Sequence, residues 1–244
     1  MKKCFISSLV VGSHFENPDV PGKFPRIEDY DYFLFTNLSP EKLDTSWDIK
    51  DIQFKNDRKS ITNSRFVKFQ GWKILKDYDI IIYCDAWLRP IDDINIWKRV
   101  IKLTIDSENG LVQSPHPSHN CPFDEFNDIL RQKKDSTENL IKTKKLFEKN
   151  KLEKGKGLWE GGTFCYYTHN DKVKTLFNKV WEFLSSEEYT HRDQPTMALS
   201  IHVTGISPLR LPCKYRCYIL EGNKHGGMRS LFLRSGHMGV HSYG

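Results

Sequence analysis

Three charged side chains surround one apolar run in the middle of the chain. The run Ile80–Cys84 ends at Asp85, and Arg65 and Lys68 lie three residues apart in the segment before it. Residues three apart are neighbours on a helix, so both cations can approach one crevice. A carboxylate with two cations suits a metal–diphosphate group, because a metal ion bridges carboxylate to phosphate while arginine and lysine neutralise the remaining charge. Taken alone, Asp85 is equally well explained as a turn residue.

Two further acids are candidates for proton transfer or charge stabilisation. Glu160 precedes Gly161 and Gly162, and glycines allow the backbone to approach a ligand closely. Asp193 precedes Gln194 and a proline, a position that suits a helix N-cap as well as a functional acid. A buried carboxylate can act as a general base on a hydroxyl group. Both interpretations of Asp193 stay open at this point.

These side chains have to be positioned by strands that alternate with helices. Continuous apolar runs predict strands at residues 4–11, 32–36, 79–84, 111–113 and 162–167. Apolar spacing and start signals predict helices over 60–76, 92–105 and 124–150, after Asn170 and near Asp193. The alternation indicates an α/β fold with a mostly parallel sheet. Ligands of such sheets bind at the carboxyl ends of the strands, which is where Asp85 falls.

Length and composition predict one globular domain over residues 1–244. Hydrophobic residues make up 38% and aromatic residues 13%, which is enough to fill a core and excludes a disordered chain. No apolar run approaches the roughly 20 residues of a membrane span. Met1–Val11 is interpreted as a first strand and not as a secretory signal, because serines interrupt it. The six scattered cysteines predict buried thiols in a reducing compartment, so we expect a cytoplasmic protein.

The positive charge is confined to one segment. Residues 131–156 contain ten basic and four acidic residues, which accounts for the whole net charge of +6. Such a run is typical of a solvated helix face, or of a collar that attracts an anionic ligand. No aromatic residues alternate with the lysines as they would in a platform for single-stranded nucleic acid. We therefore expect no nucleic-acid partner, although polyanion binding through this segment is kept as an alternative.

The stretches Asn63–Trp72 and Tyr78–Ala86 resemble nucleotide-sugar glycosyltransferases of the GT-A fold. They are most similar to the hexosyltransferase-like family formerly catalogued as a domain of unknown function in plants, bacteria and large viruses. Further similarities follow in the same order, at His116-Pro117 with Asp124-Glu125, at 157–162 and at 192–194. The resemblance covers roughly residues 30–205. It implies a GT-A-like Rossmann-type sandwich with helices on both faces of the sheet, in a viral or bacterial protein.

The resemblance also implies roles for the matching residues. For the nucleotide-sugar donor it implies binding by Arg65, Lys68, Asp85, Ala86, Gly161 and Gln194. For catalysis it implies Glu160 and Asp193, and for the acceptor side His116 and Trp159. Residues 1–110 would form the donor half and residues 111–244 the acceptor half.

A divalent cation, Mn²⁺ or Mg²⁺, is implied at Asp85, and His225 is similar to the late histidine that completes the metal site in related enzymes. The sequence departs from the family's Asp-x-Asp pattern, because the second acid is replaced by Trp87. Asp85 could hold a metal with His225 and phosphate oxygens, or could bind only a ribose hydroxyl. His116 and His119 form a weak metal pattern, since no third ligand lies near them in the sequence.

The predicted function is transfer of a hexose-type sugar from a UDP- or GDP-linked donor to a glycan or other hydroxyl acceptor. One alternative is a degenerate transferase domain that binds a glycan or a partner without catalysis. Another is a sugar nucleotidyltransferase, which would need a glycine-rich phosphate loop after the first strand. The segment Gly12-Ser13-His14 is poor in glycine for that role. The residues do not decide between inversion and retention at the anomeric carbon.

Overall fold

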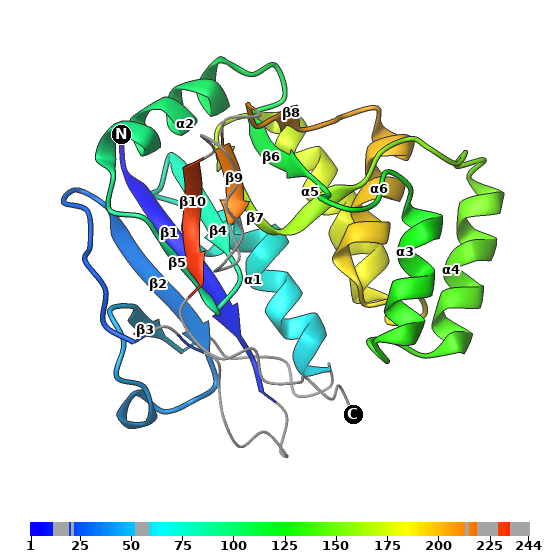
Figure 1. The fold of residues 1–244 in the computed structure, drawn as a ribbon, viewed down its shortest axis with the longest axis horizontal. Helices are drawn as coiled ribbons and strands as arrows, with labels where there is room; N and C mark the ends of the chain where they lie inside the picture. The colour runs from blue at the N-terminus through cyan, green and yellow to red at the C-terminus, as the bar shows by residue number, and fades with distance from the viewer. Residues whose placement is uncertain (12–19, 21, 52–58, 213–214, 219–228, 235–244) are drawn as a thin grey trace.

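A seven-stranded sheet forms the centre of the computed structural model, which describes residues 1–11, 20, 22–51, 59–212, 215–218 and 229–234 (Figure 1). Its strands are β1 (Lys3–Leu9), β2 (Asp31–Thr36), β3 (Asp48–Lys50), β4 (Ile80–Cys84), β6 (Leu111–Pro115), β7 (Trp159–Tyr167) and β8 (Leu209–Arg210). They lie in the order β3-β2-β1-β4-β7-β6-β8. Neighbouring strands are parallel except where β7 pairs antiparallel with β4 and β6. The prediction of a mostly parallel sheet is confirmed.

A smaller sheet covers part of one face of the central one. It contains β5 (Leu88–Pro90), β9 (Tyr215–Tyr218) and β10 (Arg229–Arg234), in the order β5-β10-β9. Because β10 pairs antiparallel with β5, Phe232–Arg234 lie against the segment that follows Asp85. A short 3-10 helix, Pro40–Lys42, precedes β3.

Helices cover both faces of the central sheet, as expected. On one face lie α1 (Ser60–Ile74), α5 (Asp171–Ser185) and α6 (Asp193–Thr204), and on the other lie α2 (Ile94–Asp106) and the smaller sheet. The side chains of β4 alternate between the two: Ile81 and Tyr83 pack toward α1, whereas Ile82 packs toward Trp97 of α2. A strand covered on both faces needs apolar residues at every position, which explains the continuous run.

The segment predicted as one helix over 124–150 is instead a hairpin of two. Helix α3 spans Pro122–Arg131 and α4 spans Thr137–Lys149. The chain turns between them at Lys133, whose φ is 52°, and Ser136 caps α4 by accepting a hydrogen bond from the Asn139 amide at 3.1 Å. Folding back lets the rings of Phe126 and Phe147 stack with centroids 5.5 Å apart. Both rings are buried in the hairpin, whereas in one long helix they could not pack against each other.

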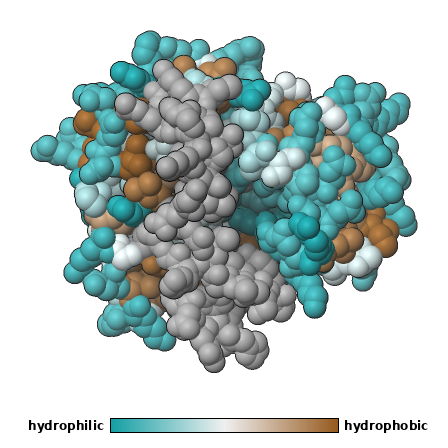
Figure 2. All heavy atoms as spheres, in the orientation of Figure 1, coloured by the Kyte–Doolittle hydropathy of each residue, from teal (hydrophilic) through white to brown (hydrophobic). Residues whose placement is uncertain are grey.

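The lysine-rich surface of the hairpin is exposed to solvent. Lys144, Lys145 and Lys149 of α4 are all exposed, whereas Phe147 on the same helix is buried. Figure 2 shows mostly hydrophilic residues over α3 and α4. The basic segment is therefore the solvated helix face that its charge pattern suggests.

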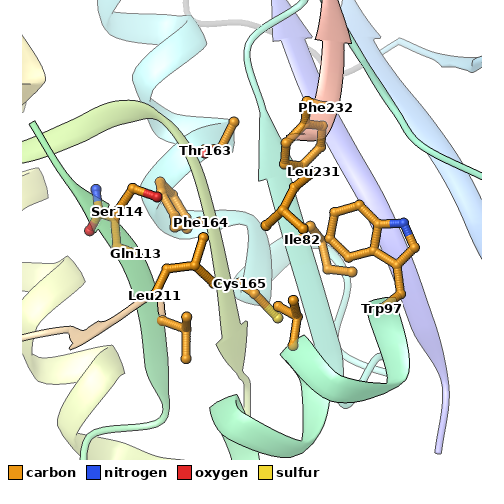
Figure 3. A pocket seen from close by; sticks show the side chains of 12 residues that line it. Ile82, Trp97, Gln113, Ser114, Thr163, Phe164, Cys165, Leu211, Leu231 and Phe232 are labelled. Atoms are coloured by element: carbon orange, nitrogen blue, oxygen red, sulfur yellow. The ribbon is translucent and has the colours of Figure 1, made fainter. Parts of the chain in front are cut away.

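A small cavity lies between the central sheet and the elements that cover it on the α2 side. Its lining is mainly apolar and includes Ile82, Trp97 and Phe232 (Figure 3). None of the residues predicted for the site lines it. Within the described part of the chain, no helix is both long enough and apolar enough to cross a membrane.

Candidate active site

The end of β4 and the start of β7 bring the predicted acids together. The two strands are antiparallel, so Cys84 at the end of β4 pairs with Thr163 of β7. The amide of Asp85 then donates a hydrogen bond to the carbonyl oxygen of Gly162 at 2.9 Å. As a result, residues 75 positions apart in the sequence, Asp85 and Glu160, lie at one edge of the sheet.

The ammonium group of Lys68 lies between two of these carboxylates. Helix α1 packs on β1 and β4 and directs Lys68 to this edge, where its Nζ contacts Oδ2 of Asp193 and lies 3.6 Å from Oδ1 of Asp85. Arg65, one turn earlier, places Nη2 3.6 Å from Oδ1 of Asp193. Asp85 and Arg65 are therefore linked through Lys68 and Asp193.

Of the four charged side chains linked in this way, Asp85 is the most exposed to solvent. The side chain of Lys68 is 1% exposed, that of Asp193 is 4% and that of Arg65 is 9%, whereas Asp85 is 30% exposed. A ligand that approaches from solvent therefore meets Asp85 first.

Asp193 is held as an anion by its neighbours. Burial by itself would raise the pKa of Asp193, but the positive charges of Arg65, Lys68 and Arg192 outweigh it and hold that pKa well below its usual range. Asp193 is the first residue of α6, and the N-cap position belongs to Arg192, which makes no side-chain capping bond. The interpretation of Asp193 as the N-cap is therefore wrong: its carboxylate faces α1 instead.

Glu160 has the opposite environment. Its side chain is buried, Oε1 accepts a hydrogen bond from the Gly162 amide at 3.0 Å, and its backbone oxygen accepts one from Gln113 Nε2 at 2.7 Å. Burial raises the pKa of Glu160, and although the Gly162 amide and Lys68 counteract this, the net direction is upward. The pKa of Glu160 is therefore raised, whereas that of the neighbouring Asp193 is lowered.

The two glycines after Glu160 are required by the carboxylates around them. A Cβ atom on Gly161 would lie 3.0 Å from Oδ2 of Asp193 and 3.1 Å from Cγ of Gln194. A Cβ atom on Gly162 would lie 3.2 Å from both Asp85 Oδ2 and Glu160 Oε1. The sequence predicted close approach of a ligand to these glycines; the structure shows close approach of the protein's own acids.

The two residues predicted for the acceptor side lie together beside Glu160. Pro115 of β6 pairs with Trp159 of β7, and the amide of the next residue, His116, donates to the carbonyl oxygen of Leu158 at 2.8 Å. The ring of His116 stacks on that of His119, with centroids 5.2 Å apart. Both predicted residues therefore lie at the same end of the strand pair.

Several residues near the site are not found by sequence reasoning. Tyr83 donates its hydroxyl to Oδ1 of Asp85 at 3.0 Å, but in the sequence it is indistinguishable from a core residue of a buried strand. Arg192 and Lys134 act electrostatically on the acids, although they lie in loops far apart in the sequence. Of the remaining predictions, Ala86 and Gln194 are buried beside the site, and His225 lies outside the described residues.

At the edge that contains Asp85, the described residues supply only one good metal ligand. Asp85 is partly exposed and one of its oxygens, Oδ1, already accepts a hydrogen bond from Tyr83. Asp193 and Glu160 are buried and engaged by Lys68 and by Gly162. These residues alone do not complete a site for a divalent cation, so the predicted role of Mn²⁺ or Mg²⁺ depends on groups beyond them.

The sheet order, the helices on both faces and the acidic edge after β4 define the GT-A fold of glycosyltransferases, as the sequence resemblance implied. The chain is similar to the apo crystal structure of mouse xyloside xylosyltransferase 1, with 10% identity over 96% of this chain and 97% of that one and a TM-score of 0.54. It is also similar to the apo structure of the bifunctional glycosyltransferase WbbM, with 10% identity and a TM-score of 0.51 over 88% of this chain and 40% of that chain. No family model and no curated protein sequence matches. At this level of identity, the similarity establishes the fold.

Proposed function

We propose that the protein is a glycosyltransferase that moves a hexose-type sugar from a UDP- or GDP-linked donor to a glycan or other hydroxyl acceptor. The observation that supports this most is the set of three acids, Asp85, Glu160 and Asp193, at the carboxyl end of β4. In open α/β sheets, ligands bind at this edge. The GT-A fold supports the same class of reaction by analogy.

The donor would bind at the exposed edge that contains Asp85. Loss of a nucleoside diphosphate leaves negative charge on its phosphates, and nearby fixed positive charge stabilises that charge. Arg65 and Lys68 supply such charge from within the protein. Ala86, from the donor half of residues 1–110, lies at the same edge as Gly161 and Gln194, which the acceptor half of residues 111–244 contributes. A divalent cation at Asp85 and His225 would add further positive charge when bound.

The two buried acids would have different roles in the transfer step. Glu160 is the candidate general base, because its raised pKa favours accepting a proton from the acceptor hydroxyl. Asp193 remains ionised and stabilises positive charge that develops at the anomeric carbon. The acceptor would lie toward His116 and Trp159, in the half formed by residues 111–244.

The test is a product assay with the purified protein, UDP- and GDP-hexoses and a panel of glycan acceptors, with and without Mn²⁺. Release of nucleoside diphosphate together with a glycosylated product or free hexose is the expected result. Glu160→Gln should slow product formation by about 10²- to 10⁴-fold, whereas Glu182→Gln, at an exposed acid paired with Lys179, should not change it.

Two outcomes would contradict the proposal. Donor binding with neither transfer nor hydrolysis would favour the non-catalytic alternative. Formation of a nucleotide sugar from a nucleoside triphosphate and a sugar phosphate would favour the nucleotidyltransferase.

A further inference from the structure

A second group of polar side chains lies where the loop after β6 meets α3. His119 from the loop and Glu125 and Asp128 from α3 each place one ligand atom within 4.8 Å of the other two. Nε2 of His119 lies 2.8 Å from Oδ2 of Asp128 and 3.7 Å from Oε2 of Glu125. Glu125 and Asp128 are three residues apart on one helix and therefore project on the same side.

Glu125 has an unusual environment for a carboxylate. Its side chain is 8% exposed, and it accepts no hydrogen bond from the part of the chain that the structure describes. Nε2 of His119 and Nε2 of His116 lie 3.7 and 3.8 Å from Oε2, which is too far for a hydrogen bond. Two ligands that each lie about 2.1 Å from one ion can be up to about 4.2 Å apart, so the spacing suits a shared cation. Burying a carboxylate that has neither a hydrogen-bond donor nor a cation beside it lowers the stability of the folded protein.

His116 supports this group without being a ligand. Its Nδ1 accepts hydrogen bonds from the amides of His119 at 2.9 Å and Ser118 at 3.3 Å. The proton of the neutral ring is then on Nε2, which faces Glu125. Because its ring also stacks on His119, His116 orients two of the three ligands.

We propose that His119, Glu125 and Asp128 bind one divalent transition-metal ion, and that Zn²⁺ binds most tightly among Zn²⁺, Mn²⁺ and Mg²⁺. One imidazole nitrogen with two carboxylate oxygens is a set that Zn²⁺ accepts, whereas Mg²⁺ prefers oxygen ligands alone. His119 is 21% and Asp128 30% exposed, so a further coordination position faces solvent. The ion would hold the loop of His116 against α3, beside the acceptor side of the proposed active site.

The basic residues near Glu125 do not contact its carboxylate as a bound metal ion would. Lys134 and Arg192 lower the energy of the Glu125 carboxylate from a distance, but neither forms an ion pair with it within 4.0 Å among the described residues. Asp128 is paired with His119 and with the exposed Arg131. Among the described residues, Glu125 thus has only the rings of His116 and His119 as basic groups within 4.0 Å of its carboxylate, and it accepts no hydrogen bond from them.

The experiment is calorimetric titration of Zn²⁺, Mn²⁺ and Mg²⁺ into protein freed of metal by a chelator. The wild type should bind one equivalent of Zn²⁺ that Glu125→Gln and His119→Gln lose or bind at least about tenfold more weakly. His169→Gln is the matched control, because His169 pairs with Asp79 at 2.7 Å and no third ligand joins them among the described residues. Asp85→Asn should keep the equivalent, which separates this site from the donor edge.

Unchanged zinc stoichiometry and affinity in both Glu125→Gln and His119→Gln would overturn the proposal. Zinc bound by other groups of the chain would appear as equivalents that every variant retains. The melting temperature of each metal-free variant shows whether it is folded. If Glu125→Gln unfolds, Asp128→Asn decides the question, since the partly exposed Asp128 can be changed with less effect on packing.

Discussion

Lys68 is the residue on which the charge arrangement of the site depends. Its ammonium is 1% exposed and lies between Asp193 and Asp85. A buried charge is tolerated only when it is paired, and removing one partner leaves the other uncompensated. The same contact that stabilises the fold therefore fixes the ionisation of Asp193, which the proposed reaction requires.

The first prediction concerns the stability of Asp193→Asn. Loss of this carboxylate should lower the free energy of unfolding by about 3–5 kcal/mol at neutral pH, because Arg65 and Lys68 would stay buried with less compensation. Urea unfolding measures the change. Asp48→Asn, which breaks the exposed pair with Arg26, is the matched control and should cost less than about 1 kcal/mol.

The pH dependence of that difference follows from the lowered pKa of Asp193. A carboxyl group with a folded pKa below its unfolded value, about 3.9, adds stability above that value and loses it as the pH falls toward the folded pKa. The gap in unfolding free energy between the wild type and Asp193→Asn should therefore shrink below about pH 4. A gap that is constant from pH 7 to pH 3 would show that Asp193 is not held as an anion.

The second prediction concerns Glu160 as the proton acceptor. Because burial raises its pKa, the acidic limb of kcat/KM should have its midpoint above the ordinary value for glutamate, about 4.3. Glu160→Gln should lower the rate by about 10²- to 10⁴-fold and remove that limb. A pH–rate profile of both proteins checks this, and an unchanged acidic limb in Glu160→Gln would remove Glu160 from the proton transfer.

Among the elements, β7 shows what the sequence could and could not predict. Its apolar run predicted a strand, as the runs before it predicted β1, β2 and β4. The local pattern holds no information on direction, however, and β7 alone runs antiparallel to its neighbours in the central sheet. That direction places Gly161 and Gly162 beside Asp85. The sequence therefore identified the acids by residue type. That Asp85 and Glu160 lie close together follows from the pairing of β4 with β7, two strands far apart in the sequence.

Helix boundaries were harder to predict where tertiary packing decides them. Helices α2 and α5 bury the apolar residues that their spacing predicts, and Asn170 caps α5 by accepting a hydrogen bond from the amide of Lys172 at 2.9 Å. Helix α1 forms where it was predicted, but most of the residues that it buries are polar, Arg65 and Lys68 among them. The break between α3 and α4 has no proline or glycine to mark it. It forms because Phe126 and Phe147 can pack against each other only if the chain folds back.

The third prediction tests the crowding around β7. Gly161→Ala should displace Asp193 or Gln194 by a few tenths of an ångström, since its Cβ would lie 3.0 and 3.1 Å from their atoms. Small displacements at a reacting site are costly, so we expect transfer to fall by about tenfold or more. Gly22→Ala is the control, because its Cβ would meet only a backbone oxygen at 3.8 Å. Equal transfer rates in the two variants would show that the approach of the acids to Gly161 does not matter.

At the scale of the whole molecule, two groups of basic residues in the described part of the chain differ in their exposure to solvent. Lys144, Lys145 and Lys149 of α4 are exposed, whereas Arg65 and Lys68 are buried beside the acids. Exposed charge is screened by salt, and buried charge is screened much less. If the buried cations hold the donor, as proposed, its binding should depend only weakly on salt between 0.05 and 0.5 M (estimated range). Binding that weakens steeply over that range would favour polyanion capture by α4.

The central claim is that the edge containing Asp85 and Arg65 binds a nucleoside diphosphate. Calorimetric titration of UDP and of GDP, with and without Mn²⁺, tests it most directly. The account predicts that at least one nucleotide binds with a stoichiometry of one, and that Arg65→Ala weakens this binding by about 1.5–3 kcal/mol while Arg26→Ala, at an exposed pair, leaves it unchanged. Binding of neither nucleotide under any condition, or equal binding by Arg65→Ala and the wild type, would contradict it.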